Sequence, residues 1–155
     1  MKTLVLGLGN EIIADDAVGV IAARQLQSQL VGRADVMSCA LHGLALLELF
    51  IDYDRAILID AIQTGKIAPG TIIEIQPDEL PPVQGPSPHF AGIPEMLDLA
   101  RKLQVKFPSE FRIFAMEVAD MQTIGGPITP AVAAAIPELC RKVSEAVEGR
   151  HTNGS

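Results

Sequence analysis

The sequence predicts an α/β fold, a three-layer α/β/α sandwich of the phosphorylase/hydrolase-like kind around a mixed, mostly parallel sheet of about five strands. Apolar runs of strand length alternate with segments whose apolar residues recur at helical spacing, and connectors rich in glycine and proline separate them. The length of 155 residues and the hydrophobic content of 48% are typical of one domain with a substantial core. We expect this domain to span residues 1–148, followed by a flexible tail at 149–155.

The predicted strands are short runs of mostly apolar residues. They lie at residues 4–6, 34–39, 55–62, 71–75 and 111–118. The connector between the third and fourth runs is short and rich in turn-forming residues. We therefore expect these two strands to run antiparallel to each other.

The predicted helices show apolar residues at helical spacing or carry a helix-start signal. They lie at residues 16–30, 44–50, 93–103 and 129–147. Pro94 falls in a first turn, where proline is tolerated, whereas Pro137 lies inside its helix and is expected to kink it. Residues 76–89 hold five prolines and are expected to form a long loop of the kind that is usually functional.

Composition excludes several classes of partner and compartment. The formal net charge of −7 argues against nucleic acid, because phosphate binding requires a basic surface. No apolar run reaches the length of a bilayer span, and the N-terminus lacks a signal-peptide pattern. We therefore expect a cytoplasmic protein without a membrane or nucleic-acid partner. Cys39 and Cys140 show no CxxC spacing and are expected to be buried, reduced thiols.

The turn after the first strand, Gly7-Leu8-Gly9-Asn10, invites comparison with a dinucleotide-binding motif. That motif requires a third glycine at the position of Ile12, and the helix start here carries Asp15 and Asp16, which would repel a diphosphate. The turn lies at the carboxyl end of a predicted strand, where open α/β sheets bind their ligands. A site for a cation or a polar peptide fits these residues better than a nucleotide site.

Three side chains are candidates for such a site. Asp16 follows the first strand, Asp60 ends the apolar part of the third, and His89 lies in the proline-rich loop. Two carboxylates and an imidazole can bind a divalent metal and leave a coordination position open for substrate. Each also has a structural alternative: Asp16 as a helix-start residue, Asp60 as the partner of a lysine or the cap of a turn, and His89 as an exposed loop histidine.

The remaining polar residues are expected to be structural. Asp15 is interpreted as a helix cap, and Glu117 and Asp120 as loop acids on a solvated face. Neither cysteine is expected to lie in a basic setting that would lower the pKa of its thiol, and Ser87 lies in no nucleophile-elbow pattern. No covalent nucleophile is therefore predicted.

Taken together, these motifs resemble those of the [NiFe] hydrogenase maturation endopeptidases, over residues 1 to about 147. The motifs are Gly7-Leu8-Gly9-Asn10 with Asp15-Asp16 and Gly19, Ile59-Asp60-Ala61, Ser87-Pro88-His89, residues 113–118, and Thr129-Pro130-Ala131-Val132. Two positions depart from the family pattern. Ala17 replaces a frequent glycine, and Leu41-His42-Gly43 replaces a Gly-Gly-Thr type of loop, which bears on the choice of precursor.

The resemblance implies an activity and a role for each candidate residue. Such enzymes remove a C-terminal extension from the precursor of the hydrogenase large subunit after nickel insertion. They recognise nickel that the precursor carries and have no resident cofactor. The family's two carboxylates and histidine match Asp16, Asp60 and His89, with Asp16 standing where the family often has glutamate. The alternatives are a non-catalytic chaperone for the nickel-loaded precursor, a phosphate-binding module at residues 7–10, and a metallopeptidase with resident zinc.

Overall fold

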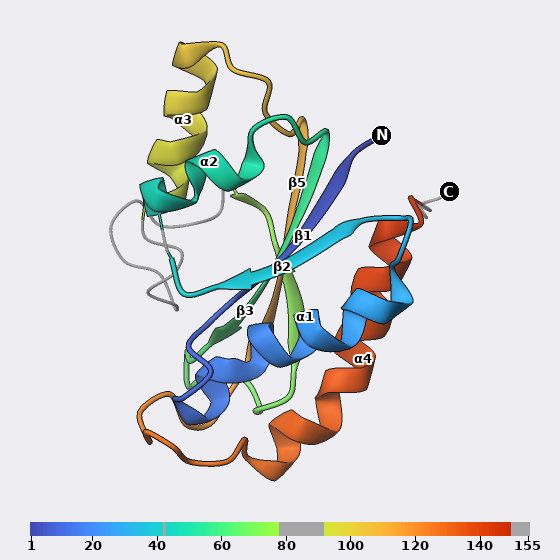
Figure 1. Cartoon of the computed structure of the whole chain (residues 1–155). Helices are drawn as coiled ribbons and strands as arrows, with labels where there is room; N and C mark the ends of the chain where they lie inside the picture. The colour runs from blue at the N-terminus through green and yellow to red at the C-terminus, as the bar shows by residue number, and fades with distance from the viewer. Residues whose placement is uncertain (42, 78–91, 150–155) are drawn as a thin grey trace.

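A five-stranded sheet with helices on both faces forms the protein in a computed structural model that describes residues 1–41, 43–77 and 92–149 (Figure 1). The strands of the described chain are β1 (Thr3–Leu8), β2 (Asp35–Cys39), β3 (Arg55–Ile62), β4 (Ile72–Ile75) and β5 (Glu110–Glu117). Their order across the sheet is β2-β1-β3-β5-β4. Strands β2, β1, β3 and β5 are parallel, and β4 pairs antiparallel with β5 at one edge. The mixed, mostly parallel sheet expected from the sequence is confirmed.

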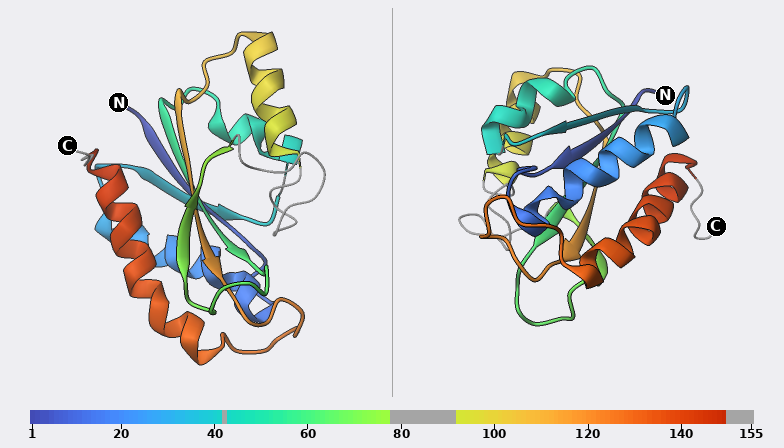
Figure 2. Two further views of the ribbon diagram at one scale, coloured as in Figure 1. Left: turned by 180° about the vertical axis from the view of Figure 1, so that it is seen from behind. Right: turned by 60° about the horizontal axis from the view of Figure 1, so that its bottom comes forward.

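In the part of the chain that the structure describes, helices cover both faces of the sheet, so the predicted three layers are present (Figure 2). Helices α1 (Val18–Gln29) and α4 (Pro130–Val147) pack on one face. Helices α2 (Leu47–Phe50) and α3 (Ile93–Leu103) pack on the other. No helix of the described residues is long and apolar enough to cross a membrane.

The central strands supply side chains to both cores. In β1, Leu4, Leu6 and Leu8 pack on the α2/α3 side, whereas Val5 packs on the α1/α4 side. Every residue of β3 is buried. A parallel strand covered on both faces needs such a continuous run rather than an alternating pattern, which explains why the sequence identified β3 with its correct bounds.

Several elements differ in detail from the sequence prediction, and β1 extends beyond residues 4–6, so Gly7 and Leu8 belong to the strand and not to the turn. The segment expected to start a helix at residue 16 begins with a 3-10 turn, η1 (Ala14–Ala17), before α1. The short helix expected at residues 44–50 is a 3-10 turn, η2 (Gly43–Leu46), followed by α2. Strand β4 runs antiparallel to β3 as expected, but β5 lies between them and is its hydrogen-bonded partner. Pro137 lies inside α4, which continues on both sides of it.

Helix α1 lies unusually close to the ends of β1 and β3 because glycines occupy the contact. A Cβ atom at Gly19 would lie 2.2 Å from the carbonyl oxygen of Leu8 and 2.8 Å from that of Ile59. A Cβ atom at Gly7 would lie 2.1 Å from the carbonyl oxygen of Gly19. Backbone therefore packs directly on backbone here, and this contact sets the position of η1, which precedes α1.

Arg55, the first residue of β3, connects the end of α4 to the amino ends of β1 and β3. Its buried guanidinium donates hydrogen bonds to the carbonyl oxygens of Ala146 and Val147 at 2.8 and 2.6 Å, and to the hydroxyl of Thr3 at 3.2 Å. A cation at a helix C-terminus satisfies free carbonyl groups and is favoured by the helix dipole. This arrangement fixes the last turn of α4.

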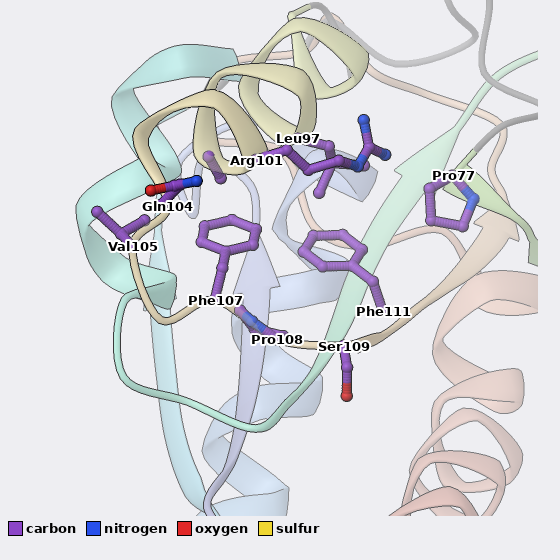
Figure 3. A pocket seen from close by; sticks show the side chains of 10 residues that line it. Pro77, Leu97, Arg101, Gln104, Val105, Phe107, Pro108, Ser109 and Phe111 are labelled. Carbon is purple, nitrogen blue, oxygen red and sulfur yellow. The ribbon is translucent and has the colours of Figure 1, made fainter.

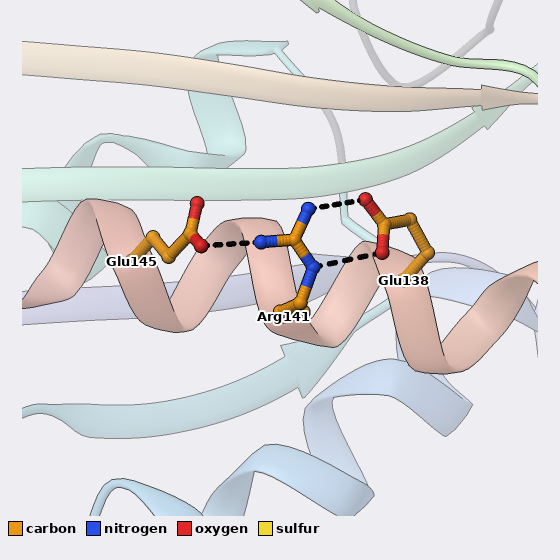
Figure 4. A network of polar contacts seen from close by, with 3 residues as sticks. All are labelled: Glu138, Arg141 and Glu145. Carbon is orange, nitrogen blue, oxygen red and sulfur yellow. Dashed lines mark hydrogen bonds and ion pairs between the residues drawn. The ribbon is translucent and has the colours of Figure 1, made fainter. Parts of the chain in front are cut away.

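The outer face of α4 is stabilised differently, by exposed charges. Arg141 binds Glu138 one turn before it and Glu145 one turn after it (Figure 4). The hydrogen bond and charge of Arg141 lower the pKa of Glu138, and the two glutamates raise the pKa of Arg141. Exposed pairs of this kind contribute little to stability, so this face is a solvated surface rather than a candidate site.

Candidate active site

The candidate site lies at the carboxyl edge of the sheet, between β1 and β3. From β1 the chain passes through α1 to β2 on one side, and from β2 it returns to β3 on the other side of β1. The connection that leaves β1 leads to β2 on one side, and the connection that leaves β3 leads to β4 on the other side. The point between β1 and β3 is therefore a topological switch point. Open α/β sheets bind their ligands in the crevice at such a point.

Asp16 reaches this edge through η1. Its side chain is 6% exposed, and its Oδ2 atom accepts a hydrogen bond of 3.1 Å from the backbone N–H of Asn10. A Cβ atom at Gly9 would lie 2.1 Å from the carbonyl oxygen of Asp16, so the turn after β1 and η1 are in direct backbone contact. Asp16 also lies in the first turn of η1, next to Ala17, the residue that precedes α1, which is the position that the helix-start alternative gives it.

Asp60 lies in β3 itself, two residues before its end. It is fully buried, and its Oδ1 atom accepts a hydrogen bond of 2.8 Å from the backbone N–H of Ala61. Leu58 and Ile62 pack in the core on the α2/α3 side, so the alternation of the strand directs Asp60 to that side as well.

The structure therefore brings two of the three predicted residues to one edge of the sheet. The turn η1, which carries Asp16, contacts β3, which carries Asp60. His89 lies outside the described residues, as do the other two histidines, His42 and His151. Within residues 1–41, 43–77 and 92–149 no group of three or more His, Cys, Asp or Glu side chains is arranged to hold a metal. The three-residue site remains a prediction.

Asp15 has a different role from the one expected. It does not cap a helix; its fully buried carboxylate accepts hydrogen bonds from the backbone N–H groups of Ala119, Asp120 and Thr129. The hydroxyl of Thr129 also donates to it. Thr129 precedes α4 as expected, but its side chain makes no capping bond because its hydroxyl is directed to Asp15. The interpretation of Asp15 as a helix cap was wrong, because its hydrogen-bond partners lie more than 100 residues later in the sequence.

Glu117 is also not the solvated loop acid that was expected. It ends β5 at 1% exposure and accepts hydrogen bonds from the N–H groups of Thr64 and Gly65, at 2.9 and 3.0 Å, and from the hydroxyl of Thr64. It thereby orders the connection that follows β3. Asp120 is partly exposed, and hydrogen bonds from the side chain of Thr123 and from the N–H groups of Gln122 and Thr123 lower the pKa of its carboxyl group.

The cysteines match the expectation of buried, reduced thiols only in part, because Cys39 is not fully buried. Cys140 is buried and Cys39 is half-buried, and neither forms a disulfide. Burial raises the pKa of both thiols. Because the thiolate is the nucleophilic form, neither cysteine is poised to attack a substrate at neutral pH.

A cavity of about 580 Å³ lies elsewhere, between α3 and the start of β5 (Figure 3). Phe107 and Phe111 form its floor, with Leu97 beside them and Arg101 at its rim. It opens near the amino end of β5, whereas Asp16 and Asp60 lie at the carboxyl ends of β1 and β3. We assign it no part in the candidate active site.

The fold and the two carboxylates define a class, that of α/β proteins with an acidic site at the switch point of a mostly parallel sheet. Comparison with known proteins narrows this class. Residues 20–146 match the family model described as hydrogenase maturation protease. The chain belongs to the hydrogenase maturation protease family.

Individual relatives agree with this assignment. The chain is 31% identical to the hydrogenase expression/formation protein HupD of Rhizobium leguminosarum bv. viciae, over 88% of this chain and 69% of the relative. It is 28% identical to the hydrogenase 2 maturation protease of Escherichia coli (strain K12), over 95% and 91% of the two chains. The solved structure of the hydrogenase maturating endopeptidase HybD from E. coli superimposes with a TM-score of 0.81 at 28% identity, over 96% and 93% of the chains.

Proposed function

We propose that this protein is an endopeptidase that removes the C-terminal extension of a [NiFe] hydrogenase large-subunit precursor once nickel has been inserted. The nickel ion arrives with the precursor and is recognised by Asp16, Asp60 and His89, so the enzyme needs no resident cofactor. Membership of the hydrogenase maturation protease family supports the reaction class. The single observation that carries the site assignment is the meeting of the Asp16 turn and the Asp60 strand at the switch point.

The burial of both carboxylates supports recognition of a cation. Asp16 is 6% exposed and Asp60 is fully buried, so both carboxylates lie largely out of water. Keeping a carboxylate charged in a low-dielectric setting is costly, and an incoming divalent cation offsets that cost. The carboxylates are therefore stabilised most when the precursor brings its nickel ion. Cleavage would then depend on whether nickel has been inserted.

The start of α3 supports the inclusion of His89. Strand β5 begins at the amino edge of the sheet, and only residues 104–109 separate it from α3, so α3 ends near that edge and begins toward the carboxyl edge. Helix α3 covers the same face to which Asp60 is directed. His89 precedes Gly92, the residue before α3, by three positions, a reach of at most about 11 Å along the chain.

The chemistry is hydrolysis of one peptide bond. A water molecule attacks the scissile carbonyl, its proton passes to a base, and the amine of the extension leaves with a proton. The precursor's nickel polarises the carbonyl or the water, or else Asp16 or Asp60 accepts the proton from the attacking water. In both routes the two carboxylates must lie within reach of the same metal-bearing peptide.

The test is incubation with nickel-loaded and nickel-free precursor, read by mass spectrometry. Wild type should shorten the loaded precursor only. Asp16→Ala, Asp60→Ala and His89→Ala should each lower the cleavage rate by more than about 100-fold while remaining folded. Asp98→Ala is the matched control, because Asp98 is an exposed carboxylate on α3 that pairs with Lys102. Unchanged cleavage by all three site variants would refute the assignment, and a stable complex with uncleaved precursor would instead support the chaperone alternative.

A further inference from the structure

Asp15 joins two segments that are far apart in the sequence. Its Oδ2 atom accepts hydrogen bonds from the N–H groups of Ala119 at 3.0 Å and Asp120 at 2.8 Å, and its Oδ1 atom accepts one from Thr129 at 2.8 Å. The Thr129 hydroxyl lies 2.9 Å from Oδ2, and the N–H of Asp15 itself donates to the carbonyl oxygen of Asp120 at 2.8 Å. Both carboxylate oxygens are thus committed to the segment 119–129.

The same two segments meet at a second place. Ile13 and Ile124 form an antiparallel β-bridge, and the N–H of Gly125 donates to the carbonyl oxygen of Ile12 at 2.6 Å. The turn after β1 and the segment between β5 and α4 are therefore one packed unit. Within the described residues Asp15 is the buried charge that holds this unit together.

Asp16 belongs to this unit through short connections. Asp15 and Asp16 are adjacent in the four-residue turn η1, and the N–H of Asp16 donates to the carbonyl oxygen of Ile13 at 2.8 Å. Asn10, which donates to the Asp16 carboxylate, also accepts a hydrogen bond from Ile12 through its side chain. A shift of Asp15 away from the segment 119–129 would therefore move Asp16.

We propose that Asp15 is a positioning residue for the proposed reaction: by fastening the segment 119–129 to η1 it fixes the Asp16 carboxylate for the precursor's nickel. This inference rests on the proposed function. Asp15 is not itself a ligand, because its oxygens already accept amide hydrogen bonds. It acts as residues behind metal ligands do, by orienting the group that makes the contact.

The substitution Asp15→Asn tests whether the hydrogen-bonding oxygens of Asp15, and not only the size of its side chain, are required. Asp15→Asn keeps the shape but replaces one oxygen with an NH₂ group, which then faces backbone N–H donors. Thr129→Val removes only the hydroxyl contact and leaves the N–H of Thr129 in place. Arg55→Gln is the matched control, because it breaks buried hydrogen bonds at the amino ends of the strands, away from Asp15 and Asp16.

Three measurements on each full-length variant test the proposal: amide hydrogen exchange at residues 119, 120 and 129, the Kd for Ni²⁺ alone by calorimetry, and kcat and KM for the loaded precursor. In Asp15→Asn we expect faster exchange at these amides, a Kd raised by roughly 10- to 100-fold, and a KM raised more than kcat is lowered. Thr129→Val should show smaller changes of the same kind. Arg55→Gln should lower stability and leave the Kd for Ni²⁺ and the KM unchanged.

The outcomes separate the two proposals. Wild-type values of Kd and KM in Asp15→Asn, with the three amides exposed, would overturn the positioning role and leave the proposed function in place. Absence of cleavage by wild type, together with weakened Ni²⁺ binding in Asp15→Asn, would overturn the proposed function and keep the positioning role.

Discussion

Replacing Gly19 with alanine tests whether close backbone packing sets the position of the candidate site. Gly19 is the second residue of α1, and a helix-propensity argument alone predicts that alanine there stabilises the protein by up to about 1 kcal/mol. The structure predicts the opposite sign. The added Cβ atom would lie 2.2 Å from the Leu8 carbonyl oxygen and 2.8 Å from that of Ile59, both backbone atoms in buried strands.

The size of the effect follows from two opposing contributions, the gain in helix propensity and the steric clash of the added Cβ atom. Neither strand can yield without breaking ladder hydrogen bonds on both sides, so α1 has to move away by several tenths of an ångström. Inserting an extra group into a tightly packed interior costs about 1–3 kcal/mol, and contact with two strands places this position at the upper end. After the gain in helix propensity is subtracted, we expect a net loss of about 2 kcal/mol. The shift also carries η1, so cleavage activity should fall with stability.

Urea unfolding followed by far-UV circular dichroism measures this difference. Ser28→Ala is the matched control, because Ser28 is exposed on the same helix and alanine there should change stability only by a few tenths of a kcal/mol, in the favourable direction. A Gly19→Ala protein as stable as wild type, or more stable, would show that the helix can move without cost. The close contact would then not be what positions η1.

Three further outcomes are expected. Arg55→Gln should lower the free energy of unfolding by about 2–4 kcal/mol, because the carbonyl groups at the end of α4 lose a charged donor, and an unchanged urea midpoint would contradict this. Tyr53, the only tyrosine, should titrate with a pKa of about 12 by absorbance at 295 nm, raised first by burial and then by Asp35. This tyrosine's contribution to stability is present below the ordinary pKa of a tyrosine and is lost as pH rises toward 12, and Asp35→Asn should lower its pKa. Iodoacetamide should modify half-buried Cys39 before buried Cys140, and the reverse order by peptide mapping would contradict the assigned burial.

Much of the fold could be predicted because its signals are local. A parallel strand buried on both faces needs an unbroken apolar run, and β3 was found with its correct bounds. Asp60 could be singled out for the same reason, since a carboxylate inside such a run contrasts with its neighbours, and its role in the site stays a prediction. The bounds of α3 were also predicted correctly, because Pro94 and the apolar spacing both lie within the helix.

What sequence reasoning missed depends on partners far along the chain. Asp15 looks like a helix cap within its own window, and its true partners begin 104 residues later. Glu117 follows an apolar run as a loop acid would, but its partner Thr64 lies 53 residues earlier. The pairing of β4 with β5 rather than β3 has the same cause, because short connectors predict direction but not the neighbour in the sheet. In each case the deciding contact is set by tertiary structure.

The long-range fastening of the first turn has a consequence during synthesis. A ribosome releases the Asp16 region early, yet the amide of Thr129, which joins it 114 residues later, emerges only when most of the polypeptide has been translated. Stalled or prematurely terminated products that end before Thr129 would carry Asp16 and Asp60 without their ordered surroundings. An ordered candidate site is therefore expected only in chains that extend at least through Thr129.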